Sequence, residues 1–393
     1  MSLVLKLMTF PALGFNLLAS DSSVVPSPYQ KWTHGPPTNA EFFPLAVWLQ
    51  SASRAQQYRQ AGFSIYVGLW KGPTEEQLAV LKQAEMRLIC HQNEFARGHL
   101  DDPAIIGWIH GDEPDNAQSL GGGKGYGPPI PPQKIVEHYW KLGQADPTRP
   151  VMLNLGQAVA WDNWIGRGAR RNHPEDYPEY VKGCDIASFD IYPVVHDSPE
   201  VSGKLWFVAR GVERLRKWSG ERVVWNCLEC TRISNLERKP TPQQVRCEAW
   251  MSLIHGSRGL IYFVHQFKPV FREAALLDDP DMLAAVTALN RQITELAPVL
   301  NSPTIEGAGR VESENAEAPI AFMGKRHGGS TYLFGVAMRE GKTTAKFTVD
   351  GFTGENSATV LGEDRKLAVR QGSFSDTFAP WDAHIYQWRQ LRK

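Results

Sequence analysis

The sequence predicts an α/β protein: a (β/α)8 TIM barrel followed by a small all-β domain of the sandwich type. Short apolar runs alternate with helix-compatible segments from residue 43 to about residue 300, which is typical of βα units around a parallel sheet. Eight such runs can be counted, and eight strands close a barrel. From about residue 303 the pattern changes to short alternating strands without helices.

The strands and helices of the barrel are predicted from hydrophobic periodicity. Strands are expected at residues 43–49, 63–69, 86–91, 105–110, 151–155, 186–192, 223–228 and 260–265, and helices at 53–60, 74–83, 135–142, 201–218 and 242–255. An open doubly wound sheet is the alternative, but no G-x-G-x-x-G follows the first strand. The glycine cluster at 121–127 stands before a proline-rich stretch and indicates a flexible insertion rather than a phosphate loop.

Three segments are expected along the chain. They are an N-terminal extension over residues 1–42, the barrel over 43–302 and a C-terminal β-sandwich over 303–393, with strands at 320–323, 331–336, 344–349, 358–361, 367–370 and 383–388. The first 22 residues pair Lys6 with an apolar stretch that Pro11 interrupts. This stretch is either a degenerate signal peptide or an arm that packs on the barrel.

Composition limits the class of partner. The chain has 42 Lys and Arg residues and 42 Asp and Glu residues, so it has no net charge to attract nucleic acid or an acidic membrane surface. No apolar stretch is long enough for a membrane span. We therefore expect a neutral partner, and the sequence leaves the oligomeric state open.

The five cysteines, Cys90, Cys184, Cys227, Cys230 and Cys247, do not form a disulfide framework. Cys227 and Cys230 have C-x-x-C spacing, but residues three apart on a strand point to opposite faces. Buried free thiols are favoured over a redox or zinc role. Free thiols favour a reducing compartment and the apolar N-terminus favours export, so secreted, periplasmic and cytoplasmic locations all stay open.

Two acidic motifs stand at the ends of predicted barrel strands. Asp112 and Glu113 follow the fourth strand, and Glu229 follows the seventh. Barrel enzymes build their sites at the carboxyl ends of the strands, where these two positions face each other across the mouth. Two carboxyl groups are what hydrolysis of a glycosidic bond requires, one protonated to donate to the leaving oxygen and one ionised to attack the anomeric carbon.

Glutamates at the ends of strands four and seven of an eightfold barrel resemble glycoside hydrolase clan A, which includes cellulases of family five and β-galactosidases of family 42. The resemblance covers roughly residues 40 to 300. It implies a retaining glycosidase without a cofactor, in which Glu113 is the acid/base and Glu229 the nucleophile, with carboxyl groups about 5 to 5.5 Å apart. The chain departs from the clan in two places. It has Asp112 where an Asn is usual, and the end of its eighth strand has His265 and Phe267 instead of the usual Trp.

A sugar needs several convergent polar groups and flat apolar surfaces. Tyr192 resembles the clan A tyrosine that orients the nucleophile, and Asp190 lies on the same strand face. Two long loops, 111–132 and 156–183, add further candidates at the mouth. The candidate substrate-binding residues are Asp112, Asp190, Tyr192, Trp48, Gln50, His91, Asn93, Trp70, Asn154, Trp161 and His265.

Two other functions stay open at this stage. One is a carbohydrate-binding barrel without catalysis. The other is a non-glycosidase hydrolase or lyase in which Asp112, Asp190 and His110 converge, although the sequence has no H-E-x-x-H motif and no metal is expected. The absence of a G-x-S-x-G elbow disfavours an esterase of the α/β-hydrolase type.

Overall fold

The computed structural model describes residues 26–349 and 354–389. The expectations for the first 22 residues therefore lie outside the described part of the chain. No helix in the described ranges is long and apolar enough to cross a membrane. The proposed domain limits, 43–302 and 303–393, stay predictions.

The barrel is a parallel sheet whose strands follow one another in sequence order. Its strands are β1 (Leu45–Trp48), β2 (Ile65–Val67), β3 (Arg87–Cys90), β4 (Ile105–Ile109), β5 (Val151–Leu155), β6 (Ile186–Phe189), β7 (Val223–Val224), β8 (Asn226–Glu229) and β9 (Leu260–Phe263). β7 and β8 are two halves of the seventh strand, interrupted at Trp225. Because β7 pairs with β6 while β8 pairs with β9, and β9 with β1, the sheet closes. The predicted eightfold barrel is confirmed.

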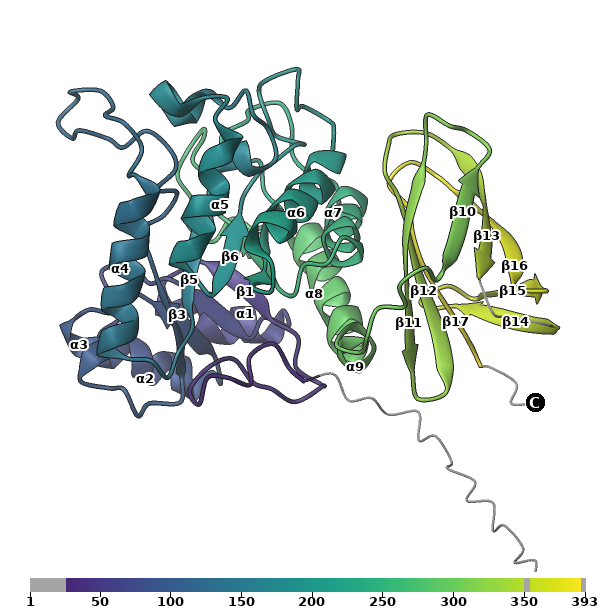
Figure 1. The fold of residues 1–393 in the computed structure, drawn as a ribbon, viewed down its shortest axis with the longest axis horizontal. Coiled ribbons are helices and arrows are strands. Elements are labelled where there is room, and N and C mark those ends of the chain that lie inside the picture. Colours follow the sequence, from purple (N-terminus) through teal and green to yellow (C-terminus); the bar gives the residue numbers. More distant parts are fainter. Residues whose placement is uncertain (1–25, 350–353, 390–393) are drawn as a thin grey trace, which may run out of the picture.

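Helices surround the barrel (Figure 1). They are α1 (Ala55–Gln60), α2 (Glu75–Gln83), α3 (Glu94–Arg97), α4 (Pro132–Ala145), α5 (Tyr177–Tyr180), α6 (Trp206–Ser219), α7 (Pro242–Ile254), α8 (Pro280–Glu295) and α9 (Ala297–Leu300), with five short 3-10 turns at Ala52–Arg54, Gln157–Val159, Ile165–Arg170, Pro174–Asp176 and Val181–Gly183. α2 and α7 begin with capping boxes, in which Thr74 pairs with Gln77 and Thr241 with Gln244. These caps satisfy amide groups that the first helical turn leaves without partners.

The barrel interior is filled by side chains from alternate strand positions, as a closed eightfold sheet requires. Tyr29 and Trp32, from the segment before the first strand, belong to this inner core. The indole Nε1 of Trp225 donates to the Tyr29 hydroxyl at 2.8 Å, and that hydroxyl donates to the Arg258 carbonyl at 3.2 Å. Arg258 precedes β9, so Tyr29 closes the barrel at the end where the strands begin.

The C-terminal domain is an antiparallel sheet of eight strands. They are β10 (Gly309–Ser313), β11 (Ile320–His327), β12 (Ser330–Ala337), β13 (Thr343–Val349), β14 (Glu355–Val360), β15 (Arg365–Arg370), β16 (Ser373–Phe378) and β17 (Ala383–Arg389), in the order β10-β13-β16-β15-β14-β17-β12-β11. The sequence predicts six of these and misses β10 and β16. An aromatic core that includes Phe347, Phe374 and Tyr386 fills the sheet.

The β-domain packs against α7 and α9 (Figure 1). The Trp250 ring of α7 stacks on Phe334 of β12 at 5.4 Å between centroids. The Gln243 side chain donates to a carboxylate oxygen of Asp382 at 2.8 Å. Apolar and polar contacts together join the two parts.

Candidate functional site

Glu113 lies four residues beyond the end of β4, in a strained turn. Its φ of 43° is in the left-handed region, which a residue with a Cβ atom rarely adopts. Its N–H donates to the Asn154 carbonyl at 3.2 Å, and its own carbonyl accepts from the Asn116 N–H at 3.0 Å. Strain of this kind persists only where the surroundings fix it, and it concentrates at functional sites. The backbone thus presents Glu113 at the barrel mouth.

The carboxyl groups of Glu113 and Asp190 are in hydrogen-bonding contact. The Tyr192 hydroxyl donates to Asp190 Oδ2 at 3.3 Å. Burial, and next the charges of Asp190 and Asp112, raise the pKa of Glu113 well above its usual range. Burial and the Asp112 charge raise the pKa of Asp190 to about 7. Two carboxyls in contact share a proton, because both cannot ionise cheaply at that distance.

Asp112 joins this group through Asn154. The Asn154 Nδ2 donates to Asp112 Oδ1 at 2.9 Å, and Asn154 Oδ1 accepts from the Ser188 hydroxyl at 2.7 Å. Asp112 is exposed at the mouth. The surrounding protein and the Asp115 charge nevertheless raise its pKa to about 6, although the hydrogen bond from Asn154 acts to lower it. The structure therefore brings together Glu113, Asp112, Asp190, Tyr192 and Asn154, which the sequence singles out. We call these five residues the acidic cluster.

Two residues with no predicted role hold the acidic cluster in place. Buried Asp115 accepts from the Gly156 N–H at 2.9 Å and from the Tyr177 hydroxyl at 2.8 Å. Asn116 Oδ1 accepts from the Trp164 indole at 2.9 Å. These contacts tie the loop after β4 to the loop after β5. In the sequence, Asp115 and Asn116 are visible only as polar residues that follow Glu113. Their partners lie too far along the chain to be predicted.

Glu229 ends β8 and is fully buried. Its carboxylate oxygens accept from the N–H groups of Val194 at 2.6 Å and Val195 at 3.1 Å. Its carboxyl also contacts that of Glu248, a buried residue of α7. Burial raises the pKa of Glu229 to about 8, although both backbone donors and Glu248 oppose the rise. Burial therefore favours the protonated form of this carboxyl. Its predicted part as nucleophile stays a prediction.

Several other candidate residues make contacts that maintain the fold. Buried Gln50 bonds to Tyr58, His265 and the Glu273 carbonyl. Asn93 caps α3 through Ala96 and donates to the Pro73 carbonyl. Trp48 lies in the inner core, and Trp161, nearly buried, donates to Glu200. His91 is exposed and contacts the Ile109 carbonyl. Sugar binding by these residues stays a prediction.

Trp70 and His265 belong to an aromatic group beside the mouth. Their rings meet edge to face at 6.1 Å, and the Trp70 indole donates to Glu273 Oε1 at 2.8 Å. His265 Nε2 contacts the Leu49 carbonyl at 3.0 Å. Trp70 is exposed while His265 is buried, so Trp70 is the ring that a ligand can reach.

His110 does not join Asp112 and Asp190. Its Nε2 contacts the Gly183 carbonyl at 2.8 Å and its Nδ1 contacts His138 Nδ1 at 2.8 Å. Within residues 26–349 and 354–389, no three His, Cys, Asp or Glu side chains converge as a metal site would need. All five cysteines are buried and free, as the sequence predicts.

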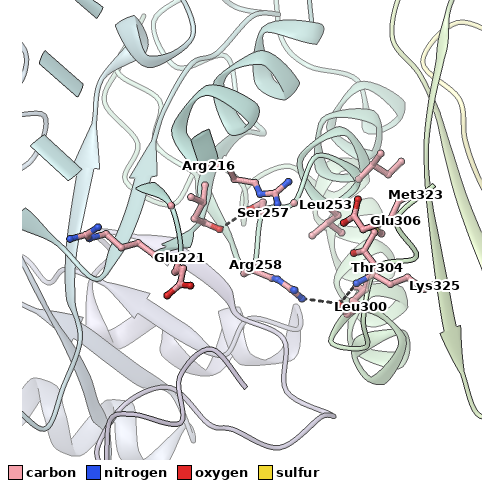
Figure 2. Close-up of a pocket in the computed structure, with 15 residues that line it drawn as sticks. Arg216, Glu221, Leu253, Ser257, Arg258, Leu300, Thr304, Glu306, Met323 and Lys325 are labelled. Carbon is pink, nitrogen blue, oxygen red and sulfur yellow. Dashed lines mark hydrogen bonds between the residues drawn. The ribbon is translucent and has the colours of Figure 1, made fainter. Parts of the chain in front are cut away.

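A cavity of about 220 Å³ lies at the opposite end of the barrel, between the segments that precede β7 and β9 and strand β11 of the C-terminal domain. Figure 2 shows Arg258 and Lys325 converging there on the Leu300 carbonyl. That carbonyl ends α9. The cavity is thus built around the junction between the two domains, away from Glu113.

The chain matches no protein-family model and no curated protein. Solved structures do share its fold. An α-amylase from Geobacillus thermoleovorans, complexed with acarbose, has a TM-score of 0.56 at 11% identity and covers 91% of this chain and 100% of that chain. AmyP in complex with maltose has a TM-score of 0.54 at 9% identity, covering 88% and 96%. The α-L-arabinofuranosidase from Thermotoga maritima, in an arabinose complex, has a TM-score of 0.50 at 10% identity, covering 86% and 89%. These matches establish the barrel with its β-domain.

Proposed function

We propose that this protein hydrolyses glycosidic bonds and that Glu113 donates the proton to the leaving oxygen. The observation that carries the proposal is the Glu113 carboxyl, presented at the barrel mouth and kept protonated by burial and by Asp190. A general acid must hold its proton near neutral pH until the bond breaks. Enzymes that share the fold and are solved with sugars or a sugar mimic support carbohydrate as the substrate class, by analogy.

The finer proposal is a retaining double displacement. Glu113 protonates the leaving oxygen while the Glu229 carboxylate bonds to the anomeric carbon, and Glu113 then takes a proton from the water that releases the sugar. This scheme requires Glu229 to be ionised. Burial and the Glu229 charge raise the pKa of Glu248 well above its usual range, so Glu248 holds its own proton and can donate it in a hydrogen bond that favours the ionised form of Glu229. Asp190 lies too close to Glu113 to attack from the other side of a sugar, so its part is to keep Glu113 protonated.

A second candidate is a carbohydrate-binding barrel without catalysis. The full burial of Glu229 favours it, because a nucleophile must reach its substrate. In this case the acidic cluster would bind sugar hydroxyl groups as hydrogen-bond donors and acceptors.

Glu113→Gln separates the two candidates. We expect the substitution to lower turnover of the best substrate in an aryl glycoside panel by roughly 10²- to 10⁴-fold, while the sugar product still binds. Glu137→Gln, on the outer surface of α4, is the matched control and should keep the wild-type rate. Wild-type protein that binds sugars but cleaves no glycoside in the panel would establish the binding role instead.

The nucleophile is identified by covalent labelling. A 2-deoxy-2-fluoroglycoside should trap an ester that peptide mapping places on Glu229. A label on another carboxyl would move the nucleophile to that residue. An inverted product anomer, read by proton NMR, would overturn double displacement altogether.

A further inference from the structure

A continuous row of aromatic rings leads from the acidic cluster into solvent. The Tyr192 ring, whose hydroxyl donates to Asp190, lies 5.3 Å from Phe263 between centroids. Phe263 lies 6.1 Å from Phe267, and Phe267 stacks on Phe271 at 5.8 Å with 29° between the ring planes. The Trp70 ring meets the His265 ring, on which Phe267 and Phe271 stack. We call the four residues together with Trp70 the aromatic track.

The outer end of the aromatic track is exposed. Phe267 is 46% exposed, Phe271 53% and Trp70 43%. Val270, between the two phenylalanines, is exposed as well. Nine large hydrophobic side chains are exposed in the described part of the chain, and four of them gather here. Grouped exposure of this kind marks a binding surface, whereas isolated exposed apolar residues need no explanation.

The loop that carries Phe267 and Phe271 is held in one conformation. Gln266 and Arg272 exchange two backbone hydrogen bonds at 2.9 Å and 2.8 Å, and the Phe267 N–H donates to the Ile233 carbonyl at 2.6 Å. The buried His265 ring lies parallel to Phe267, with 5° between the planes. A ligand would therefore meet rings that are already ordered, which lowers the entropy lost on binding.

Charge and shape indicate the class of ligand. Exposed, flat aromatic rings suit the apolar faces of sugar rings, and spacings of 5.3 to 6.1 Å place successive rings along the track. The track ends at the carboxyl groups where the proposed chemistry occurs. Only a ligand longer than one sugar ring can contact both ends.

We propose that the aromatic track is a binding site for an extended carbohydrate chain, in which Phe267 and Phe271 stack on sugar rings beyond the one at Glu113. This proposal rests on carbohydrate as the ligand class of the proposed function. It does not require catalysis. It predicts that the protein distinguishes polysaccharides from single sugar units.

The test is affinity electrophoresis of the full chain in gels that contain amylose, arabinoxylan or galactomannan. Wild-type protein should be retarded by at least one of these polymers. The double variant Phe267→Ala with Phe271→Ala should bind that polymer about 10-fold or more weakly. Hydrolysis of a small aryl glycoside should change less than about 3-fold, because its single sugar ring is bound at the acidic cluster.

Trp140→Ala is the matched control, since Trp140 is a 63% exposed aromatic residue on α4, outside the track. It should leave the retardation unchanged. Three results would each overturn the proposal. The wild-type protein is retarded by none of the polymers, the double variant is retarded as strongly as the wild type, or the double variant and the control lose retardation equally. The Glu113→Gln variant should lose hydrolysis but still be retarded by the polymer. Polysaccharide binding by the aromatic track and the proposed hydrolysis are therefore tested by separate measurements.

Discussion

At the scale of single residues, the acidic cluster depends on carboxyl groups that are kept close together. Glu113 and Asp190 share a contact, and Asp112 adds a further negative charge. Each group makes it harder for the next one to ionise. The charge of Asp112 thus raises the pKa of Glu113, which is the direction that the proposed proton donor needs.

Asp190→Asn tests this coupling. The negative charge of Asp190 raises the pKa of Glu113, so its removal should lower that pKa. The alkaline limb of the kcat/KM profile, where Glu113 loses its proton, should move to lower pH by about one unit. The measurement is the pH profile on an aryl glycoside. Asp101→Asn, on an exposed turn, should leave the limb in place, and a limb that moves to higher pH would contradict the coupling.

The buried pair formed by Glu229 and Glu248 affects stability. Burial raises the pKa of Glu229 from 4.5 to about 8. A group whose pKa is raised on folding stabilises the native state below its unfolded pKa. That stabilisation is lost as the pH rises through the folded value, so this group favours folding under acidic conditions.

At the scale of elements, the site depends on how the loops after β4 and β5 meet. A Cβ atom at Gly156 would lie 2.8 Å from Asn116 Nδ2 and 3.0 Å from Glu113 Oε1. The glycine therefore allows the β5 loop to approach the catalytic candidate closely. The Asp115 hydrogen bond to the Gly156 N–H fixes that approach.

Gly156→Ala should displace the Glu113 carboxyl without unfolding the barrel. We expect activity to fall on the order of 10- to 100-fold, since small misplacements of a catalytic group carry costs of this size. Paired kinetics and thermal melts provide the measurement. Gly143→Ala, in α4, where the added Cβ meets nothing within 4 Å, should keep full activity. Unchanged kcat in Gly156→Ala would contradict the packing argument.

At the scale of the whole molecule, Lys325 of β11 links the β-domain to the end of α9. Its ammonium donates to the carbonyls of Leu300 at 2.9 Å and Ser302 at 2.7 Å, and its side chain is buried. Burial, and next the charge of Arg258, lowers the pKa of Lys325 from 10.5 to about 7. The native state therefore binds fewer protons than the unfolded chain between these two values.

Lys325→Met should destabilise the protein by roughly 1–3 kcal/mol, because two buried carbonyls lose their donor. In the wild type, this lysine makes stability rise as the pH increases from about 7 to 10.5, and the contribution is lost as the pH falls through 7. The variant should lack that rise. Urea midpoints across this range measure both effects, with Lys346→Met on the exposed face of β13 as the control. An equal pH dependence in the variant would contradict the assignment.

The sequence predicts the eight barrel strands, five of the nine helices in the described ranges and six strands of the C-terminal domain, and it places Glu113 just after the fourth strand. It misses α3, α5, α8 and α9. Apolar runs such as 151–155 become strands because their periodicity is a local property of the chain. The acidic residues after 105–110 fall at the mouth because the strands of a parallel barrel all end on the same side. Strands β10 and β16 are also missed, because polar residues dominate both: Val311 is the one apolar side chain of β10, and in β16 the buried Asp376 separates Phe374 from Phe378.

Which side chains meet depends on the packing of segments that lie far apart in the sequence. Gln50 and Asn93 satisfy buried or capping positions, and their partners lie on other segments. Glu229 of β8 meets Glu248 of α7, and the aromatic track combines Trp70, Tyr192 and the loop after β9. Contacts between residues far apart in sequence depend on how helices and loops pack around the barrel, and hydrophobic periodicity carries no information about that packing.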